Sequence, residues 1–121
     1  MAKILIVEDD DQLRKLLREA LEDDNYEVVE ASDGEMAARV FRNDPADLII
    51  TDLIMPKKEG LGLIIDIKKD FPETNIIAIS GGGHGDPNDY LPIAARLGAV
   101  RSFAKPFKIE ELLKAVKEIL A

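Results

Sequence analysis

The stretch Ile4-Leu5-Ile6-Val7-Glu8-Asp9-Asp10 joins an uninterrupted apolar run to a cluster of carboxylates. Four consecutive large apolar residues are typical of a short strand that is buried on both faces, as in the parallel sheets of α/β proteins. The acids begin where the run ends. Because residues at the carboxyl ends of such strands line the ligand-binding crevice, this stretch predicts a central strand with an acidic site at its end.

Three further apolar runs end in polar residues that suit the same kind of site. Residues 48–51 lead to Asp52, residues 76–79 lead to Ser80, and Phe103-Ala104 leads to Lys105-Pro106. If these strands are parallel neighbours, their carboxyl ends meet at one edge of the sheet. Carboxylates, a hydroxyl and a lysine gathered there indicate a site for a divalent cation and a phosphoryl group.

Segments with helical spacing separate the strand-like runs. Leu13, Leu16, Leu17, Ala20 and Leu21 recur at i, i+3, i+4, i+7 and i+8, the apolar stripe of an amphipathic helix. The alternation continues to the end of the chain. We expect strands over residues 4–7, 27–31, 47–52, 75–80 and 100–104, and helices near residues 13–21, 34–42, 59–70, 90–97 and 109–120.

This order predicts a three-layer α/β fold, with a doubly wound parallel sheet covered by helices on both faces. In the second helix we expect the inward positions to be Met36, Ala37, Val40 and Phe41. Gly98 is expected to end the fourth helix, because glycine readily adopts the left-handed conformation of a helix terminus. Periodicity alone does not determine the order of the strands in the sheet.

Composition places the chain among soluble globular domains and narrows its partners. Its 121 residues, 46% apolar and 33% charged, fit a single domain over residues 1–121. The absence of cysteine excludes disulfides and thiolate metal sites, and with no signal peptide or membrane-length apolar run we expect a cytoplasmic protein. A net charge of -8 opposes direct binding to nucleic acid or anionic lipid.

The charges of the predicted site favour a magnesium ion. Mg²⁺ is bound by a few carboxylates together with water and phosphate oxygens. Three converging acids repel one another unless a cation is present. Formal charges of three carboxylates, one Mg²⁺ and one lysine sum to zero. Asp10 and Asp11 have another use, because acids at these positions can cap the following helix and complement its dipole.

Taken in chain order, these motifs resemble the receiver domain of two-component response regulators, including the single-domain chemotaxis type. The resemblance covers residues 3–120, and its elements are Val7-Glu8-Asp9, Asp52-Leu53-Ile54-Met55-Pro56, Ser80 and Lys105-Pro106-Phe107. It implies a flavodoxin-like sheet of five strands in the order 2-1-3-4-5. It also implies Mg²⁺ as cofactor and a cognate sensor histidine kinase, or a phosphotransfer protein, as partner.

The resemblance assigns a role to each residue of the site. Asp52 is expected to be the phosphoacceptor, forming a reactive aspartyl phosphate that suits a reversible signal. Magnesium ligands are expected from Glu8, Asp9, Asp52 and the backbone carbonyl of Ile54. Ser80 and Lys105 would contact the phosphoryl group, and the bond before Pro106 would be cis. Such a protein is a switch rather than an enzyme, limited to accepting phosphate and slow self-dephosphorylation.

Output is expected to run through the surface of the fourth helix, fifth strand and fifth helix, toward a downstream protein or a second copy of the chain. The family usually has an aromatic residue three positions before the lysine, where this chain has Ser102. Phe103 is adjacent, but strand alternation directs it to the opposite face. Our hypothesis is therefore that output depends on repacking of the loop and fourth helix alone; equal partner affinity with Asp52 free and phosphorylated would contradict it.

Besides Ser102, the chain differs from the usual receiver-domain pattern in the loop Gly81-Gly82-Gly83-His84-Gly85-Asp86-Pro87. Glycines can cradle phosphate, but this loop follows the fourth strand and has no P-loop lysine, so we interpret it as a mobile connector rather than a nucleotide site. His84, the only histidine, is interpreted as solvated.

Two other classes of protein share elements of this pattern. A phosphohydrolase with an aspartate nucleophile normally has a second acid two residues later, where this chain has Ile54. A flavin-binding electron carrier of the same fold needs a phosphate-binding loop after the first strand, where four consecutive acids, residues 8–11, repel phosphate. The absorbance of the purified protein would distinguish the flavoprotein.

Overall fold

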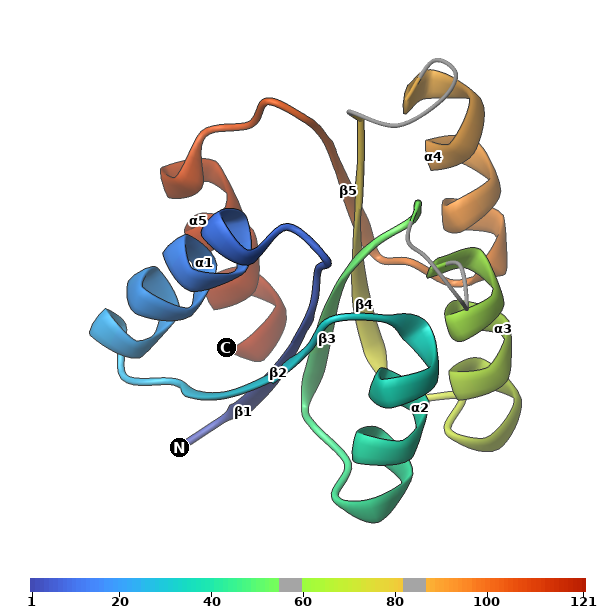
Figure 1. The fold of residues 1–121 in the computed structure, drawn as a ribbon, viewed down its shortest axis with the longest axis horizontal. Coiled ribbons are helices and arrows are strands. Elements are labelled where there is room, and N and C mark those ends of the chain that lie inside the picture. The colour runs from blue at the N-terminus through green and yellow to red at the C-terminus, as the bar shows by residue number, and fades with distance from the viewer. Residues whose placement is uncertain (55–59, 82–86) are drawn as a thin grey trace.

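A computed structural model describes residues 1–54, 60–81 and 87–121 of the chain. Within these residues, five parallel strands form a single sheet in the order β2-β1-β3-β4-β5 (Figure 1). Their bounds are Lys3–Val7 for β1, Glu27–Ala31 for β2, Leu48–Asp52 for β3, Asn75–Ser80 for β4 and Arg101–Ala104 for β5. The strand order implied by the resemblance is therefore confirmed.

Helices cover both faces of the sheet. They are α1 (Asp11–Asp23), α2 (Gly34–Asn43), α3 (Gly60–Asp70), α4 (Pro87–Leu97) and α5 (Ile109–Leu120). Figure 1 shows α1 and α5 together on one side of the sheet and α2, α3 and α4 on the other. The predicted three-layer doubly wound architecture is thus confirmed.

The alternation of side chains along β1 explains why the run is apolar throughout. Ile4 and Ile6 pack in the cluster that includes residues of α1 and α5. Leu5 and Val7 point the other way, into the cluster that includes residues of α2, α3 and α4. All four side chains are buried, so both faces of the strand from Ile4 to its end at Val7 require apolar residues.

Helix ends follow the local chemistry of the sequence. The Asp10 side chain accepts hydrogen bonds from the backbone N–H groups of Gln12 and Leu13, at 3.0 and 3.2 Å, and so caps α1 as predicted. Gly98, at φ +121°, follows the last residue of α4, and its N–H donates to the Ala94 carbonyl at 3.1 Å. The expected glycine terminus is therefore confirmed.

The start of one helix and the burial of two apolar residues differ from the sequence prediction; one of these residues, Leu16 of the predicted stripe on α1, is 52% exposed. Helix α4 begins at Pro87, three residues earlier than expected. Met36 was expected to face inward but is exposed, whereas Ala37 and Phe41 are buried. The buried stripe of α2 consists of Gly34, Ala37 and Phe41, spaced by three and four residues, and Met36 lies beside this narrow stripe rather than on it.

The interpretation of residues 82–86, including His84, lies outside the described residues. Of the helices in the described segments, none combines the length and the apolar character that crossing a membrane requires.

Candidate functional site

The carboxyl edge of the sheet is held by hydrogen bonds that extend the strand ladders beyond the strand ends. The N–H of Glu8 donates to the Ala31 carbonyl at 3.1 Å, and that of Leu53 to the Ile79 carbonyl at 2.9 Å. The N–H of Lys105 donates to the Ser80 carbonyl at 2.7 Å. The residues at these strand ends are therefore positioned by the sheet itself rather than by free loops.

Lys105 joins two of the predicted acids. Its Nζ donates to Glu8 Oε1 at 2.9 Å and to Asp52 Oδ2 at 3.1 Å. The two carboxylate side chains are only 2% and 5% exposed, and that of Lys105 is 20% exposed. The bond between Lys105 and Pro106 is cis, as predicted. Lysine therefore reaches inward across β4 and meets the acids at the ends of β1 and β3.

Burial and charge shift the proton affinities of this group. Burial is the main cause that raises the pKa of Glu8 to about 7, and the charge of Asp52 acts in the same direction. The hydrogen bond from Lys105 opposes this shift without cancelling it. Burial lowers the pKa of Lys105, but its contacts with Glu8 and Asp52 outweigh burial and raise that pKa above its ordinary value. Lys105 therefore remains an ammonium, while Glu8 titrates near neutral pH.

Three acids at this edge are close enough to share a cation. One carboxylate oxygen from each of Glu8, Asp9 and Asp52 lies within 4.8 Å of the others. Glu8 and Asp52 are buried and Asp9 is exposed, so the cluster opens to solvent on one side. Hard oxygen ligands with an open side fit Mg²⁺, which retains several waters. The donor set therefore matches the cation expected from the sequence.

Asp10 and Ile54 complete the acidic edge in different ways. Asp10 caps α1, and its N–H donates to Glu8 Oε2 at 3.1 Å, so it supports the cluster without joining it. The N–H of Ile54 donates to Asp52 Oδ1 at 3.2 Å and orients that carboxylate. A role for the Ile54 carbonyl as a metal ligand stays a prediction.

Ser80 presents a buried hydroxyl that has no hydrogen-bond partner among the described residues. The residue is fully buried at the end of β4. Among the described residues, its Oγ is the buried side-chain oxygen or nitrogen that lacks a hydrogen-bond partner. Such an orphaned group is costly and calls for a ligand or water. A phosphoryl oxygen beside Asp52 is a partner of suitable chemistry.

Glycines allow the backbone to pack closely around the site. A Cβ atom on Gly60, the first residue of α3, would lie 2.1 Å from the Asp52 carbonyl oxygen. A Cβ atom on Gly81, which has φ +136°, would lie 2.9 Å from the Cβ of Lys105. Gly60 was not singled out from the sequence. Its only signal was a glycine at the start of an apolar helical segment, which does not reveal a contact with the preceding strand.

Sequence reasoning also missed Arg14, whose Nη1 donates to the Glu8 carbonyl at 2.8 Å. Two adjacent basic residues, Arg14 and Lys15, follow the four acids in the first turns of α1, and the sequence does not indicate which of them reaches back to the acidic turn. Ser102 and Phe103, by contrast, lie as expected. Phe103 packs on the α1 and α5 side with its ring 6.0 Å from that of Phe107, and Ser102 is exposed.

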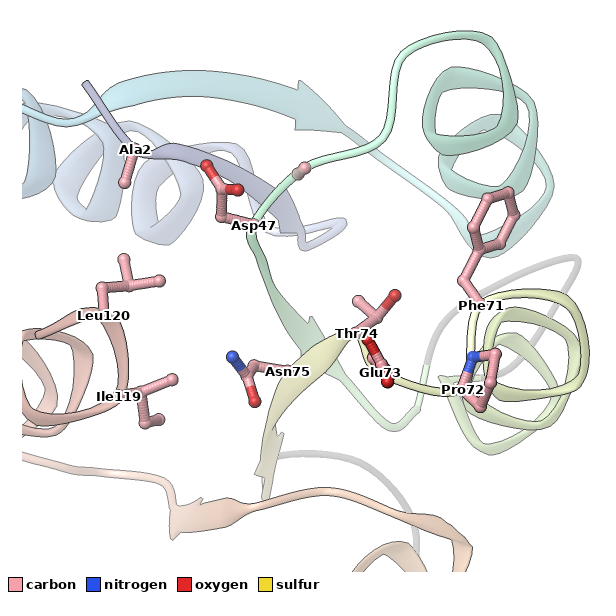
Figure 2. A pocket seen from close by; sticks show the side chains of 10 residues that line it. Ala2, Asp47, Phe71, Pro72, Glu73, Thr74, Asn75, Ile119 and Leu120 are labelled. Carbon is pink, nitrogen blue, oxygen red and sulfur yellow. The ribbon is translucent and has the colours of Figure 1, made fainter.

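One sizeable cavity among the described residues lies at the opposite edge of the sheet from this chemistry. It has a volume of about 800 Å³ and opens at the amino ends of the strands, beyond the start of β4 at Asn75 (Figure 2). Its apolar lining includes Phe71, Pro72, Ile119 and Leu120. The functional site is thus identified by its converging charges and not by the size of a hollow.

The strand order places this doubly wound sheet in the flavodoxin-like fold class. The carboxylates and lysine at its carboxyl edge form an acidic site of the kind that can bind a metal ion. Within that class, residues 4–117 match the family described as the response regulator receiver domain. The chain therefore belongs to the receiver domains of two-component response regulators.

Individual relatives agree with this assignment. The chain is 37% identical over 118 residues to a probable transcriptional regulator, ycf27, from Guillardia theta, covering 98% of this chain and 45% of that protein. The chain thus spans about half the length of the curated relatives it matches.

Solved structures agree as well. A response regulator receiver domain protein from Clostridium thermocellum superposes with a TM-score of 0.90 at 32% identity, covering 99% of this chain and 94% of that one. The response regulator TrrA from Thermotoga maritima, solved in complex with Mg²⁺ and BeF, has a TM-score of 0.86 at 32% identity, with coverage of 98% and 99%.

Proposed function

We propose that this chain is a phosphoacceptor switch in which Asp52 receives a phosphoryl group from a histidine of a sensor kinase or phosphotransfer protein. The observation that carries the proposal is the position of Lys105, whose Nζ donates to both Glu8 and Asp52 and whose N–H donates to the carbonyl of Ser80. A nucleophilic carboxylate, a fixed cation and a hydroxyl donor with no partner among the described residues are groups that phosphoryl transfer uses.

In the proposed step, an Asp52 carboxylate oxygen attacks the phosphorus of the donor's phosphohistidine. The new P–O bond forms as the P–N bond breaks, and the electron pair stays with the imidazole nitrogen, which takes up a proton. Lys105, whose raised pKa keeps it charged, neutralises the added negative charge. Ser80 donates its hydroxyl hydrogen to a phosphoryl oxygen. Later attack by water on the phosphorus breaks the P–O bond to Asp52, releases inorganic phosphate and returns the free carboxylate; this slow self-dephosphorylation is the only further chemistry we propose.

Magnesium would be held by the carboxylates of Glu8, Asp9 and Asp52, with the Ile54 carbonyl as a further ligand. When bound, the ion offsets the charge on the acids and on the phosphoryl oxygens. The complex of TrrA with Mg²⁺ and BeF supports this assignment by similarity. The distance of 4.8 Å that spans the three acids supports it from this chain's own residues.

A groove beside Lys105 supports docking of the phosphodonor protein. Its volume is about 410 Å³, and its apolar lining is formed by Leu13, Leu16, Pro106, Phe107 and Ile109. Leu16 is 52% exposed and forms part of this apolar lining, and an exposed apolar patch is more informative than a single exposed leucine. A donor helix packed on these side chains would lie next to the carboxylate it must reach. Such a partner would meet the chain in the cytoplasm.

Output would use the surface of α4, β5 and α5. Ile93 of α4 and Val100 before β5 are 46% and 47% exposed, and Arg101 pairs with Glu118 of α5 at 2.9 Å. A downstream protein or a second copy of the chain would bind these side chains. Because the net charge is -8, we propose no direct contact of this chain with nucleic acid.

Intact-mass measurement after incubation with acetyl phosphate tests the proposal. We expect a gain of one phosphoryl group that requires Mg²⁺ and is lost in Asp52→Asn. Asp23→Asn, which removes an exposed acid at the end of α1, is the matched control and should gain the group as the wild type does. No gain in folded wild-type protein with Mg²⁺ would contradict the proposal.

A further inference from the structure

Every polar group of Glu8 is held by a partner. Its N–H donates to the Ala31 carbonyl at 3.1 Å, Oε1 accepts from Lys105 at 2.9 Å and Oε2 accepts from the N–H of Asp10 at 3.1 Å. The remaining group, the backbone carbonyl, accepts from Arg14 Nη1 at 2.8 Å. Arg14 is therefore the residue that determines how the peptide between Glu8 and Asp9 is oriented.

The Arg14 guanidinium is itself held on two further sides. Nη2 donates to Asp11 Oδ1 at 2.6 Å, and Nε lies 3.5 Å from Glu30 Oε1 on β2. The Arg14 side chain is only 19% exposed. A planar guanidinium has several donors in fixed directions and can bridge three acceptors at once. A lysine ammonium is a compact charge and bridges three separated acceptors less well. Arg14 thus ties the acidic turn to both α1 and β2.

We propose that Arg14 is a positioning residue for the metal site, an inference that rests on the proposed function. Asp9 is exposed, so its carboxylate is not oriented by burial. Its direction follows from the backbone, and the Glu8 carbonyl belongs to the peptide that sets it. By fixing that carbonyl, Arg14 holds Asp9 within the 4.8 Å cluster formed with Glu8 and Asp52 before a cation binds.

Electrostatics makes this proposal testable, because charge alone predicts the opposite result. Arg14 is a cation near a cation site, so removing it weakens repulsion of Mg²⁺. Its removal also leaves Asp11 and Glu30 with less compensation, which further favours a bound cation. A purely electrostatic role therefore predicts tighter Mg²⁺ binding in Arg14→Gln. Positioning predicts weaker binding, since losing a residue that orients a metal ligand typically costs about ten- to hundredfold in affinity.

The experiment is calorimetric titration of the whole chain with Mg²⁺, comparing wild type, Arg14→Gln and Arg18→Gln. Arg18 is the matched control, because it also lies on α1 and pairs with Glu30, at 2.6 Å, but makes no described bond to Glu8. We expect the dissociation constant to rise about tenfold or more in Arg14→Gln and to change less than twofold in Arg18→Gln. Arg14→Lys, which keeps the charge, should weaken binding too and replaces Arg14→Gln if that variant does not fold.

Phosphorylation by acetyl phosphate gives a second readout. The Mg²⁺ concentration for half-maximal rate should rise in Arg14→Gln, while the rate at saturating Mg²⁺ stays near that of the wild type. Equal or tighter Mg²⁺ binding in the Arg14 variant would overturn the inference while leaving the proposed function intact. No Mg²⁺ binding by the wild type would instead refute the proposed metal site.

Discussion

Replacing Glu8 with glutamine removes a buried carboxyl group whose pKa is raised by burial to about 7 from an ordinary value of 4.5. Between these values the folded chain holds a proton at Glu8 that the unfolded chain has released. Stability must therefore fall as pH rises through this window. Below pH 4.5 the cost of a buried charge is absent, and above pH 7 it is complete.

The size of this cost follows from the two pKa values. At about 1.4 kcal/mol for each pH unit, the interval from 4.5 to about 7 corresponds to about 3 kcal/mol, as an order of magnitude. Glu8 is only 1% exposed, so solvent screening does not reduce it substantially. Most of the cost develops between pH 5 and pH 8.

Urea unfolding at a series of pH values, in the presence of a chelator, measures the free-energy cost of the buried Glu8 charge. Between pH 5 and pH 8, the wild type should lose between about 2 and 3 kcal/mol more of its unfolding free energy than Glu8→Gln. Comparison of the two slopes cancels other titrating groups, and Asp9→Asn, which removes an exposed acid, should keep the wild-type slope. Saturating Mg²⁺ should remove the decline by compensating the carboxylate. Equal slopes for wild type and Glu8→Gln would refute the reasoning.

Two other substitutions test the packing of the site. Gly60→Ala places a Cβ 2.1 Å from the Asp52 carbonyl oxygen, so we expect a loss of about 1 to 3 kcal/mol in urea unfolding and slower phosphorylation; an unchanged midpoint would show that the contact relaxes freely. Ser80→Ala removes a buried hydroxyl without a described partner, so thermal unfolding should show stability unchanged or raised by about 1 kcal/mol, while phosphorylation by acetyl phosphate slows. A clear loss of stability in Ser80→Ala would mean that the hydroxyl is already satisfied in the free protein.

Elements with one strong local signal were predictable from the sequence. The apolar run ending at Glu8 predicted β1 and its burial on both faces, and Asp10 predicted the cap of α1. Strand order needed the resemblance, because periodicity reports which face is buried and not which strand is the neighbour. The prediction that Met36 faces inward was wrong for a related reason, because the width of a helix's buried stripe depends on the sheet on which the helix packs.

The sequence was sufficient to predict which residues at the strand ends form the candidate site, but not which contacts their side chains make. Glu8, Asp52, Ser80 and Lys105 were each found from the residue that follows an apolar run. That Lys105 bridges Glu8 and Asp52 depends on the conformation and burial of three side chains, which residue spacing does not report. Close approaches such as that of Gly60 to Asp52 join segments through backbone atoms, and such contacts leave no periodic trace in a sequence.

The most direct test of the central assignment is to locate the phosphoryl group on the chain. Borohydride reduces an aspartyl phosphate to homoserine, so peptide mass mapping after treatment with acetyl phosphate, Mg²⁺ and borohydride marks the acceptor. We predict homoserine at position 52 and at no other aspartate, and none when Mg²⁺ is chelated. Homoserine at Asp9 or Asp10 instead, or a homoserine-free chain after phosphorylation with Mg²⁺, would contradict the assignment of Asp52 as the acceptor.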